Sequence, residues 1–170
     1  MPRAEQLRFL KEVVIVAELA EVEARIRVLE EEFRKLRDVE AIKKVKYRYW
    51  RYLDTKSLDE LVDCFTEDAV ADYGPDIKLP NRNAIVAFLK GAMPRFTGVH
   101  HGHNPQIELT SDTTAKGTWA LYNYMIDNEA NRGLRIGGFY YDEYVKEKGE
   151  WKISSTTEID VFRDIWDRDS

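Results

Sequence analysis

The pattern of hydrophobic residues changes its period once in this chain, and that change limits the folds open to it. Before Pro94, apolar residues recur every three or four positions, as on the buried face of a helix. After Pro94, four segments rich in aromatic and β-branched residues are separated by turn sequences. These segments are 99–109, 114–126, 134–145 and 151–161. Helices followed by strands predict an α+β fold with one curved, cone-shaped antiparallel sheet.

The first 37 residues differ from the rest, because they contain no glycine and only one proline, Pro2. Seven apolar residues alternate in steps of four and three, which is a heptad pattern. They are Ile15, Leu19, Val22, Ile26, Leu29, Phe33 and Leu36. We expect residues 1–37 to form an amphipathic helix, which either joins other copies in a coiled coil or packs on its own domain.

Residues 38–163 are expected to form a single α+β barrel domain. Its first part is expected to hold a helix at 39–53 that ends at Asp54, a short strand at 69–73 and a helix at 83–93. Ser57 followed by Glu60 has the spacing of a capping box and predicts a short helix between the helix at 39–53 and the strand at 69–73. The acidic segment 164–170 is expected to be a frayed end.

Composition excludes several classes of protein. The chain has 170 residues and a net charge of −5, which argues against a nucleic-acid-binding face. Its one cysteine, Cys64, rules out an internal disulfide and a zinc site built from several cysteines. No apolar run is long enough to span a membrane, and the amino terminus does not read as a cleavable signal. We therefore expect a soluble cytoplasmic protein.

All three histidines lie together, at His100, His101 and His103. Histidine suits proton transfer near neutral pH, so the cluster suggests a catalytic base. A metal site is the alternative, but no third ligand has a diagnostic spacing. His101 and His103 are in phase with the apolar residues that follow, and a bulge at Pro105 would bring His100 into that phase instead.

Three further residues are candidates, each with a plainer interpretation. Tyr49 lies on the apolar face of the second helix and could be a core aromatic. Asp54, at the end of that helix, could be a solvated carboxylate. Asn123 shares an otherwise apolar strand face with Trp119, so its amide needs a partner from a neighbouring loop or a polar spot in a pocket.

These residues and their order resemble one known family. The motifs are Tyr49, Leu53-Asp54, the segment 100–105 (HHGHNP) and the segment 137–142 (GGFYYD). Over residues 38–163 the chain resembles the SnoaL-like branch of the nuclear transport factor 2 and ketosteroid isomerase superfamily. Within it, the bile acid 7α-dehydratase and hexachlorocyclohexane dehydrochlorinase branches look most similar.

The resemblance implies roles for particular residues. The catalytic histidine of the family falls on His100 and its paired aspartate on Asp54, while the tyrosine of the dehydratase branch falls on Tyr49. The second aspartate of that branch falls on Asn123, which cannot hold a proton but can orient a substrate oxygen. The late arginine of the dehalogenating branch falls on or near Thr156, so halide chemistry is not supported. His103 is kept as a second choice for the base.

The resemblance therefore implies a lyase, of the dehydratase type, that needs no cofactor and no metal. Its substrate is expected to be a hydrophobic, cyclic, carbonyl-containing molecule such as a steroid, polyketide or aromatic thioester. We expect Asn123, His103, Trp119 and Tyr73 to contact it. A ketosteroid-type isomerase or cyclase is the first alternative, and a non-catalytic binding or assembly module is the second. A homo-oligomer is expected, with a trimer favoured because the most similar branches form trimers.

Overall fold

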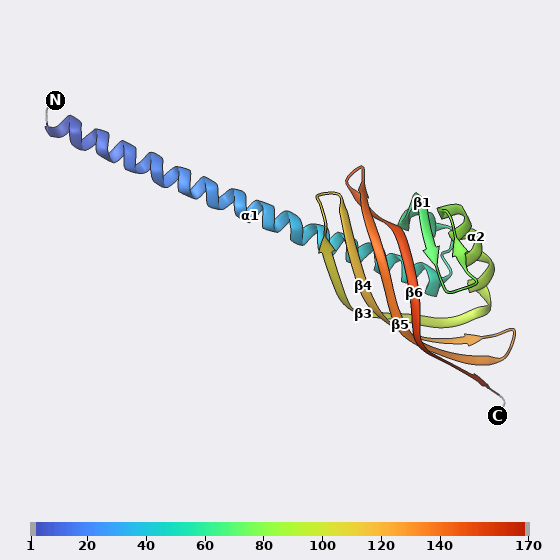
Figure 1. The fold of residues 1–170 in the computed structure, drawn as a ribbon. Helices are drawn as coiled ribbons and strands as arrows, with labels where there is room; N and C mark the ends of the chain where they lie inside the picture. Colours follow the sequence, from blue (N-terminus) through green and yellow to red (C-terminus); the bar gives the residue numbers. More distant parts are fainter. Residues whose placement is uncertain (1–2, 169–170) are drawn as a thin grey trace. The chain divides into compact units, whose positions relative to one another are not determined.

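The computed structural model describes residues 3–168, and the chain divides into two compact units, residues 1–38 and 39–170. The α+β class predicted from the sequence is confirmed, with helices before a sheet (Figure 1). The elements are α1 (Arg3–Thr55), the 3-10 turn η1 (Glu60–Cys64), β1 (Phe65–Asp72), β2 (Lys78–Leu79), α2 (Arg82–Ala92), the 3-10 turn η2 (Met93–Arg95), β3 (Phe96–Leu109), β4 (Thr114–Asp127), β5 (Arg132–Glu147) and β6 (Glu150–Asp167).

The six strands form one sheet in the order β2-β1-β6-β5-β4-β3. The four segments predicted after Pro94, which are β3 to β6, pair antiparallel as expected, whereas β1 runs parallel to β6. The reason is the long connection between these two strands, since α2 and the meander β3–β5 lie between them in the sequence. In the described part of the chain β2 and β3 form two free edges, so the sheet is open rather than a closed barrel.

The last strand extends beyond its expected end. Residues 164–167, expected to fray, continue β6 as far as Asp167 and pair with β5. Two cross-strand ion pairs accompany this pairing: Arg135 to Asp164 at 2.6 Å and Arg132 to Asp167 at 3.0 Å. Charge complementarity across the ladder explains why an acidic segment is ordered here.

A bulge in β3 decides which histidine faces inward. The pairing of β3 with β4 shifts between His103 and Gln106, and Asn104 adopts a left-handed backbone with φ of 51°. Asparagine tolerates this conformation better than most residues. The bulge expected at Pro105 is therefore confirmed, and it lets His100 and Ile107 share the inner face although their parity differs.

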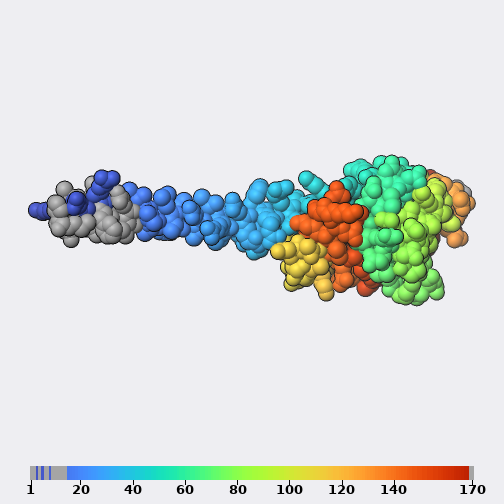
Figure 2. Space-filling model, turned by 90° about the horizontal axis from the view of Figure 1, so that it is seen from above, coloured from blue at the N-terminus to red at the C-terminus, as the bar shows by residue number. Residues whose placement is uncertain are grey.

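The core of residues 39–170 forms where the second half of α1 packs on the sheet. Its fully buried members include Ile42, Tyr49 and Leu53 from α1 and Trp119 from β4. Gly102 in β3 makes this packing possible, because a Cβ there would lie 1.8 Å from the Trp50 ring. Helix α2 begins at an Asn81 cap, whose side chain accepts a hydrogen bond from the Ala84 N–H. On the surface, α2 and β1 lie side by side (Figure 2).

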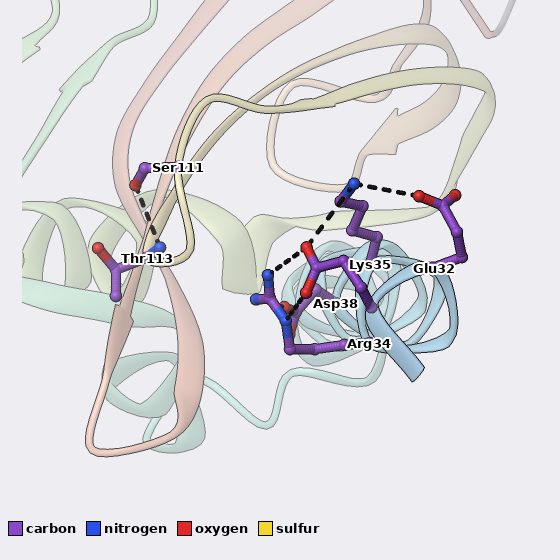
Figure 3. Close-up of polar contacts among 7 residues, drawn as sticks. Glu32, Arg34, Lys35, Asp38, Ser111 and Thr113 are labelled. Atoms are coloured by element: carbon purple, nitrogen blue, oxygen red, sulfur yellow. Dashed lines mark hydrogen bonds and ion pairs between the residues drawn. The ribbon is translucent and has the colours of Figure 1, made fainter. Parts of the chain in front are cut away.

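Helix α1 was expected to break near residue 38, with a second helix starting at Val39, and this is wrong because the helix runs unbroken to Thr55. No glycine or proline after Pro2 interrupts it. Ion pairs one turn apart support it, including Glu31 with Arg34 at 2.8 Å. Another joins Glu32 with Lys35 at 3.1 Å (Figure 3). Despite its length, neither it nor any other described helix is apolar enough to cross a membrane.

The seven residues of the heptad seam are exposed, with exposed fractions from 47% for Ile26 to 67% for Leu29. The short helix expected from Ser57 is instead the 3-10 turn η1, which begins at Glu60. Its cap position, Asp59, makes no side-chain capping bond. The Ser57 hydroxyl is bonded to Thr55 Oγ1 at 3.2 Å rather than closing a capping box.

Candidate active site

The last turn of α1 and the first half of β3 bring Asp54 and His100 together. Asp54 Oδ1 lies 2.6 Å from His100 Nδ1. The His100 backbone N–H also donates to both carboxylate oxygens, at 3.1 and 3.2 Å. Both side chains are largely buried, with exposed fractions of 13% and 6%. The carboxylate accepts the Nδ1–H of the ring and so fixes its orientation. Nε2 remains as the nitrogen that can take a proton.

A pocket of about 170 Å³ lies against His100. Its lining is mostly apolar and includes Leu53, Phe88, Met125 and Ile136. A few polar groups interrupt this surface: Tyr49, Tyr73, His100, Asn123, Tyr140, Glu158 and Arg163. Asp54 does not line the pocket and lies on the other side of the His100 ring, in a neighbouring depression. An apolar cavity with a few convergent polar groups is typical of a small-molecule site.

Two tyrosine hydroxyls meet at the wall of this pocket. Tyr49 Oη, from α1, lies 3.0 Å from Tyr73 Oη, from the segment after β1. Burial raises the pKa of Tyr49 well above its usual value, and it raises the pKa of Tyr73 as well. Both hydroxyls therefore stay protonated, and together they can donate one hydrogen bond into the pocket while keeping the bond between them.

Asn123 faces the same pocket from β4. It pairs directly with His100 in the sheet and is only 3% exposed. Within the described chain its Oδ1 atom has no hydrogen-bond partner. A buried amide oxygen without a partner carries a cost of about 1–3 kcal/mol. A ligand hydroxyl or N–H in the pocket would remove that cost.

Two residues expected to contact substrate lie elsewhere. Trp119 is fully buried, donates from Nε1 to the Tyr144 hydroxyl at 3.0 Å and packs edge-on against Trp50. It is a core residue because its large ring fills the space between α1 and the sheet. His103 is exposed and lines the depression beside Asp54 rather than the pocket, because it precedes the bulge and has the opposite parity to His100. Neither residue lines the pocket beside His100.

The sequence interpretation missed Glu158, a half-buried carboxyl that lines the pocket from β6. Burial raises its pKa above the usual 4.5, although a hydrogen bond from Tyr140 and the nearby His100 act in the opposite direction. The strand pattern concealed it, because the β5–β6 register shifts between Ile153 and Ser155. That shift moves Glu158 onto the inner face, and no sequence signal marks it.

A buried ion pair lies behind the pocket. Lys46 Nζ is 2.8 Å from Asp142 Oδ2, and neither side chain is exposed. Tyr144 and Thr156 also donate to the Asp142 carboxylate, each at 2.7 Å. The Lys46 ammonium lies 3.7 Å from the centre of the Tyr140 ring, so it contacts one of the aromatic walls of the pocket. Thr156 is thus committed to the core.

The described residues contain no group of three histidine, cysteine or carboxylate side chains placed to hold a metal ion. Cys64 is buried, and burial raises the pKa of its thiol to about 11. The described lining of the pocket offers an imidazole that Asp54 holds from outside, phenol hydroxyls, an amide, a carboxyl group and the Arg163 guanidinium.

Helix α1 against an open mixed sheet, with an apolar pocket lined by His100 and with Asp54 bound to the far side of its ring, defines an α+β protein with a pocket of small-molecule size. Residues 34–157 match the SnoaL-like domain family, and the chain belongs to this family. The resemblance drawn from the sequence is confirmed at this level.

Solved structures with the same fold include proteins of several names. One from Novosphingobium aromaticivorans, provisionally named a scytalone dehydratase, is 25% identical with a TM-score of 0.73, covering 77% of this chain and 89% of that one. A type 2 hexachlorocyclohexane dehydrochlorinase is 17% identical with a TM-score of 0.75, covering 81% and 94%. A protein with a cystatin-like fold from Caulobacter vibrioides is 12% identical with a TM-score of 0.63, covering 73% and 89%.

Proposed function

We propose that this chain is a cofactor-independent lyase of the dehydratase type, acting on a small, hydrophobic, cyclic carbonyl compound. The observation that carries the proposal is the 2.6 Å contact between Asp54 and His100 at the wall of an apolar pocket. The family and its structural neighbours, which include proteins named as a dehydratase and a dehydrochlorinase, support a small-molecule enzyme of the lyase or isomerase type.

The reaction begins with proton transfer to His100. Nε2 takes the proton from the carbon next to the substrate carbonyl, and Asp54 stabilises the imidazolium that forms. The protonated hydroxyls of Tyr49 and Tyr73 supply a hydrogen bond to the carbonyl oxygen, where negative charge develops. The hydroxyl on the next carbon then leaves as water, with a proton from the protein, and a carbon–carbon double bond remains.

Asn123 orients the substrate. Its Oδ1 atom, buried and without a partner in the described chain, accepts a hydrogen bond from a substrate hydroxyl. An amide cannot exchange a proton as a carboxylate does, so Asn123 contributes positioning only. Halide is not proposed as the natural leaving group, because Thr156, where the dehalogenating branch has its arginine, is bonded to Asp142 in the core.

The experiment is a screen of β-hydroxy carbonyl compounds built on steroid, polyketide and aromatic rings, including thioesters. Loss of water is followed by mass spectrometry in the wild-type protein and in His100→Gln. Dehydration by the wild type alone supports the proposal. A rearranged or cyclised product of unchanged mass, again dependent on His100, supports the isomerase or cyclase alternative. Ligand binding without any turnover supports a non-catalytic binding module.

We also propose that the chain forms a homo-oligomer, with a trimer favoured. The seven seam residues are exposed along the first part of α1, here called the heptad helix. An apolar strip of this length favours burial against other copies. With the seam at heptad positions a and d, a parallel arrangement places Arg25 of one copy beside Glu30 of the next, and Glu32 beside Arg37. One heptad earlier, Glu18 of one copy lies beside Glu23 of the next, and these two charges repel. Two attractive pairs against one repulsive pair favour the parallel arrangement. The cytoplasmic location stays a prediction.

A further inference from the structure

We propose that Glu158 is the general acid of this site and that it delivers the proton that the departing hydroxyl needs to leave as water. This inference rests on the proposed dehydratase function. It names a second catalytic residue and, through its chemistry, the leaving group for which the pocket is built.

Glu158 reaches the pocket from a different part of the sheet than His100. It comes from β6 and His100 from β3, and in the sheet these two strands are separated by β5 and β4. Both side chains nevertheless line the same pocket of about 170 Å³. A substrate in this pocket is therefore reached by His100 from one strand and by Glu158 from another, as an elimination requires when the base takes a proton from one carbon and the acid protonates the hydroxyl on the next.

Few of the groups that line the pocket can give up a proton. Tyr49 and Tyr73 have strongly raised pKa values, so they donate hydrogen bonds but do not easily give up a proton. Asn123 cannot give up a proton at all. His100 must be unprotonated to act as a base. Among the described residues that line this pocket, Glu158 is the one carboxyl group.

The surroundings of Glu158 raise its pKa on balance. Desolvation favours its neutral form, and Asp160 on the same strand adds to this effect. Three groups favour the carboxylate instead: the Tyr140 hydroxyl, which donates to it from β5, the His100 ring from β3 and Lys46 from α1. Tyr73 and Arg163 line the same pocket. The balance raises the pKa while leaving stabilising contacts for the carboxylate that remains after proton transfer.

The step balances without any further reactant. His100 Nε2 first receives the proton from carbon, which leaves an enolate, and the carbon–carbon double bond then forms as the carbon–oxygen bond breaks. The Glu158 carboxyl proton goes to the departing oxygen, which leaves as water. The protein is left with an imidazolium and a carboxylate, and transfer of one proton between them, directly or through solvent, restores the starting state.

A general acid at this position specifies the leaving group. A hydroxyl departs as hydroxide at high cost unless it is protonated, whereas chloride departs without a proton. The proposal therefore assigns the site to substrates that lose water. Comparing the two leaving groups also distinguishes a catalytic carboxyl from one that only shapes the pocket. A purely structural role would change the rates of loss of water and of chloride equally.

The test uses a β-hydroxycyclohexanone and its β-chloro counterpart, with formation of the conjugated enone followed by absorbance and corrected for the uncatalysed rate. The variant is Glu158→Gln, which keeps the shape and the hydrogen bond. The control is Glu143→Gln, an exposed residue of β5 paired with Lys116 outside the pocket. We expect Glu158→Gln to slow loss of water on the order of 10²-fold and to leave loss of chloride within about threefold of wild type.

Each result decides one claim. If Glu158→Gln lowers the rate equally for both leaving groups, or lowers neither rate, the acid role is overturned while the His100-dependent reaction stands. No His100-dependent turnover of either probe overturns the proposed function, and the acid role falls with it. An independent readout is the carboxyl titration of Glu158 by carbon NMR, assigned with Glu158→Gln. A midpoint above 4.5 that rises further in His100→Gln supports the proposal, and a midpoint at or below 4.5 overturns it.

Discussion

Asp54 holds His100 by two kinds of contact at once: its Oδ1 lies 2.6 Å from the ring Nδ1, and its oxygens accept the backbone N–H of the same residue. The backbone contact fixes the strand relative to the end of α1, and the ring contact fixes which nitrogen is free. One carboxylate therefore sets both the position and the tautomer of the proposed base.

Asp54→Asn separates these two effects. The amide keeps the shape and an acceptor for the backbone N–H, but it no longer offers a negative charge to the imidazolium. We expect kcat for the β-hydroxycyclohexanone to fall by about 10²–10⁴-fold with KM within about tenfold. Circular dichroism of the variant checks that the fold persists. A variant as active as wild type would remove Asp54 from the proposed mechanism.

Lys46 and Asp142 form a buried pair whose partners depend on each other. Lys46→Met leaves the Asp142 carboxylate without its cation, so we expect the free energy of unfolding to fall by about 3–5 kcal/mol. Lys116→Met, on the surface, is the control and should change it by less than about 1 kcal/mol. Urea unfolding measures both.

The double variant Lys46→Met with Asp142→Asn removes both charges. It should recover part of the stability lost in the single variant, since an uncompensated buried charge costs more than a missing pair. If the double variant loses more free energy of unfolding than Lys46→Met and Asp142→Asn lose together, this account of the pair is contradicted.

Glu158 links stability to pH. Because its pKa is raised in the folded state, the folded protein holds this proton more tightly than the unfolded chain. The proton on Glu158 therefore stabilises the folded state fully below about pH 4.5. This stabilisation is lost as the pH rises through the raised pKa. Urea unfolding of wild type and Glu158→Gln over this range should show the wild type losing stability relative to the variant as the pH rises. A constant difference would show that the folded pKa is not raised.

The heptad helix offers a matched pair of substitutions for the proposed assembly. Ile26 belongs to the seam, whereas Val28 lies outside it, and both are exposed in the single chain. Ile26→Glu places a charge in the seam, so we expect it to reduce the mass of the oligomer in sedimentation equilibrium, while Val28→Glu leaves it unchanged. Equal behaviour of the two variants would exclude the seam as the contact surface.

The residues that sequence reasoning placed well are those with local signals. The change of period, the turn sequences and the HHGHNP segment gave the fold class, the strand meander and the bulge in β3. Glu158 had no such signal, because its inward orientation depends on a register shift in β6. Trp119 shows the same limit: it shares the strand face of Asn123, but its ring reaches the Tyr144 hydroxyl in the core rather than the pocket. Alternation identifies a face of the sheet but not the position along it.

The central claim is that His100 removes a proton from carbon within this pocket. The most direct measurement is the exchange of the hydrogen next to the carbonyl of the β-hydroxycyclohexanone in deuterium oxide, together with loss of water, in wild type and His100→Gln. We expect the wild type to catalyse both, and His100→Gln to catalyse neither while still binding the probe within about tenfold of wild type. Exchange and loss of water at wild-type rates in His100→Gln would contradict the account.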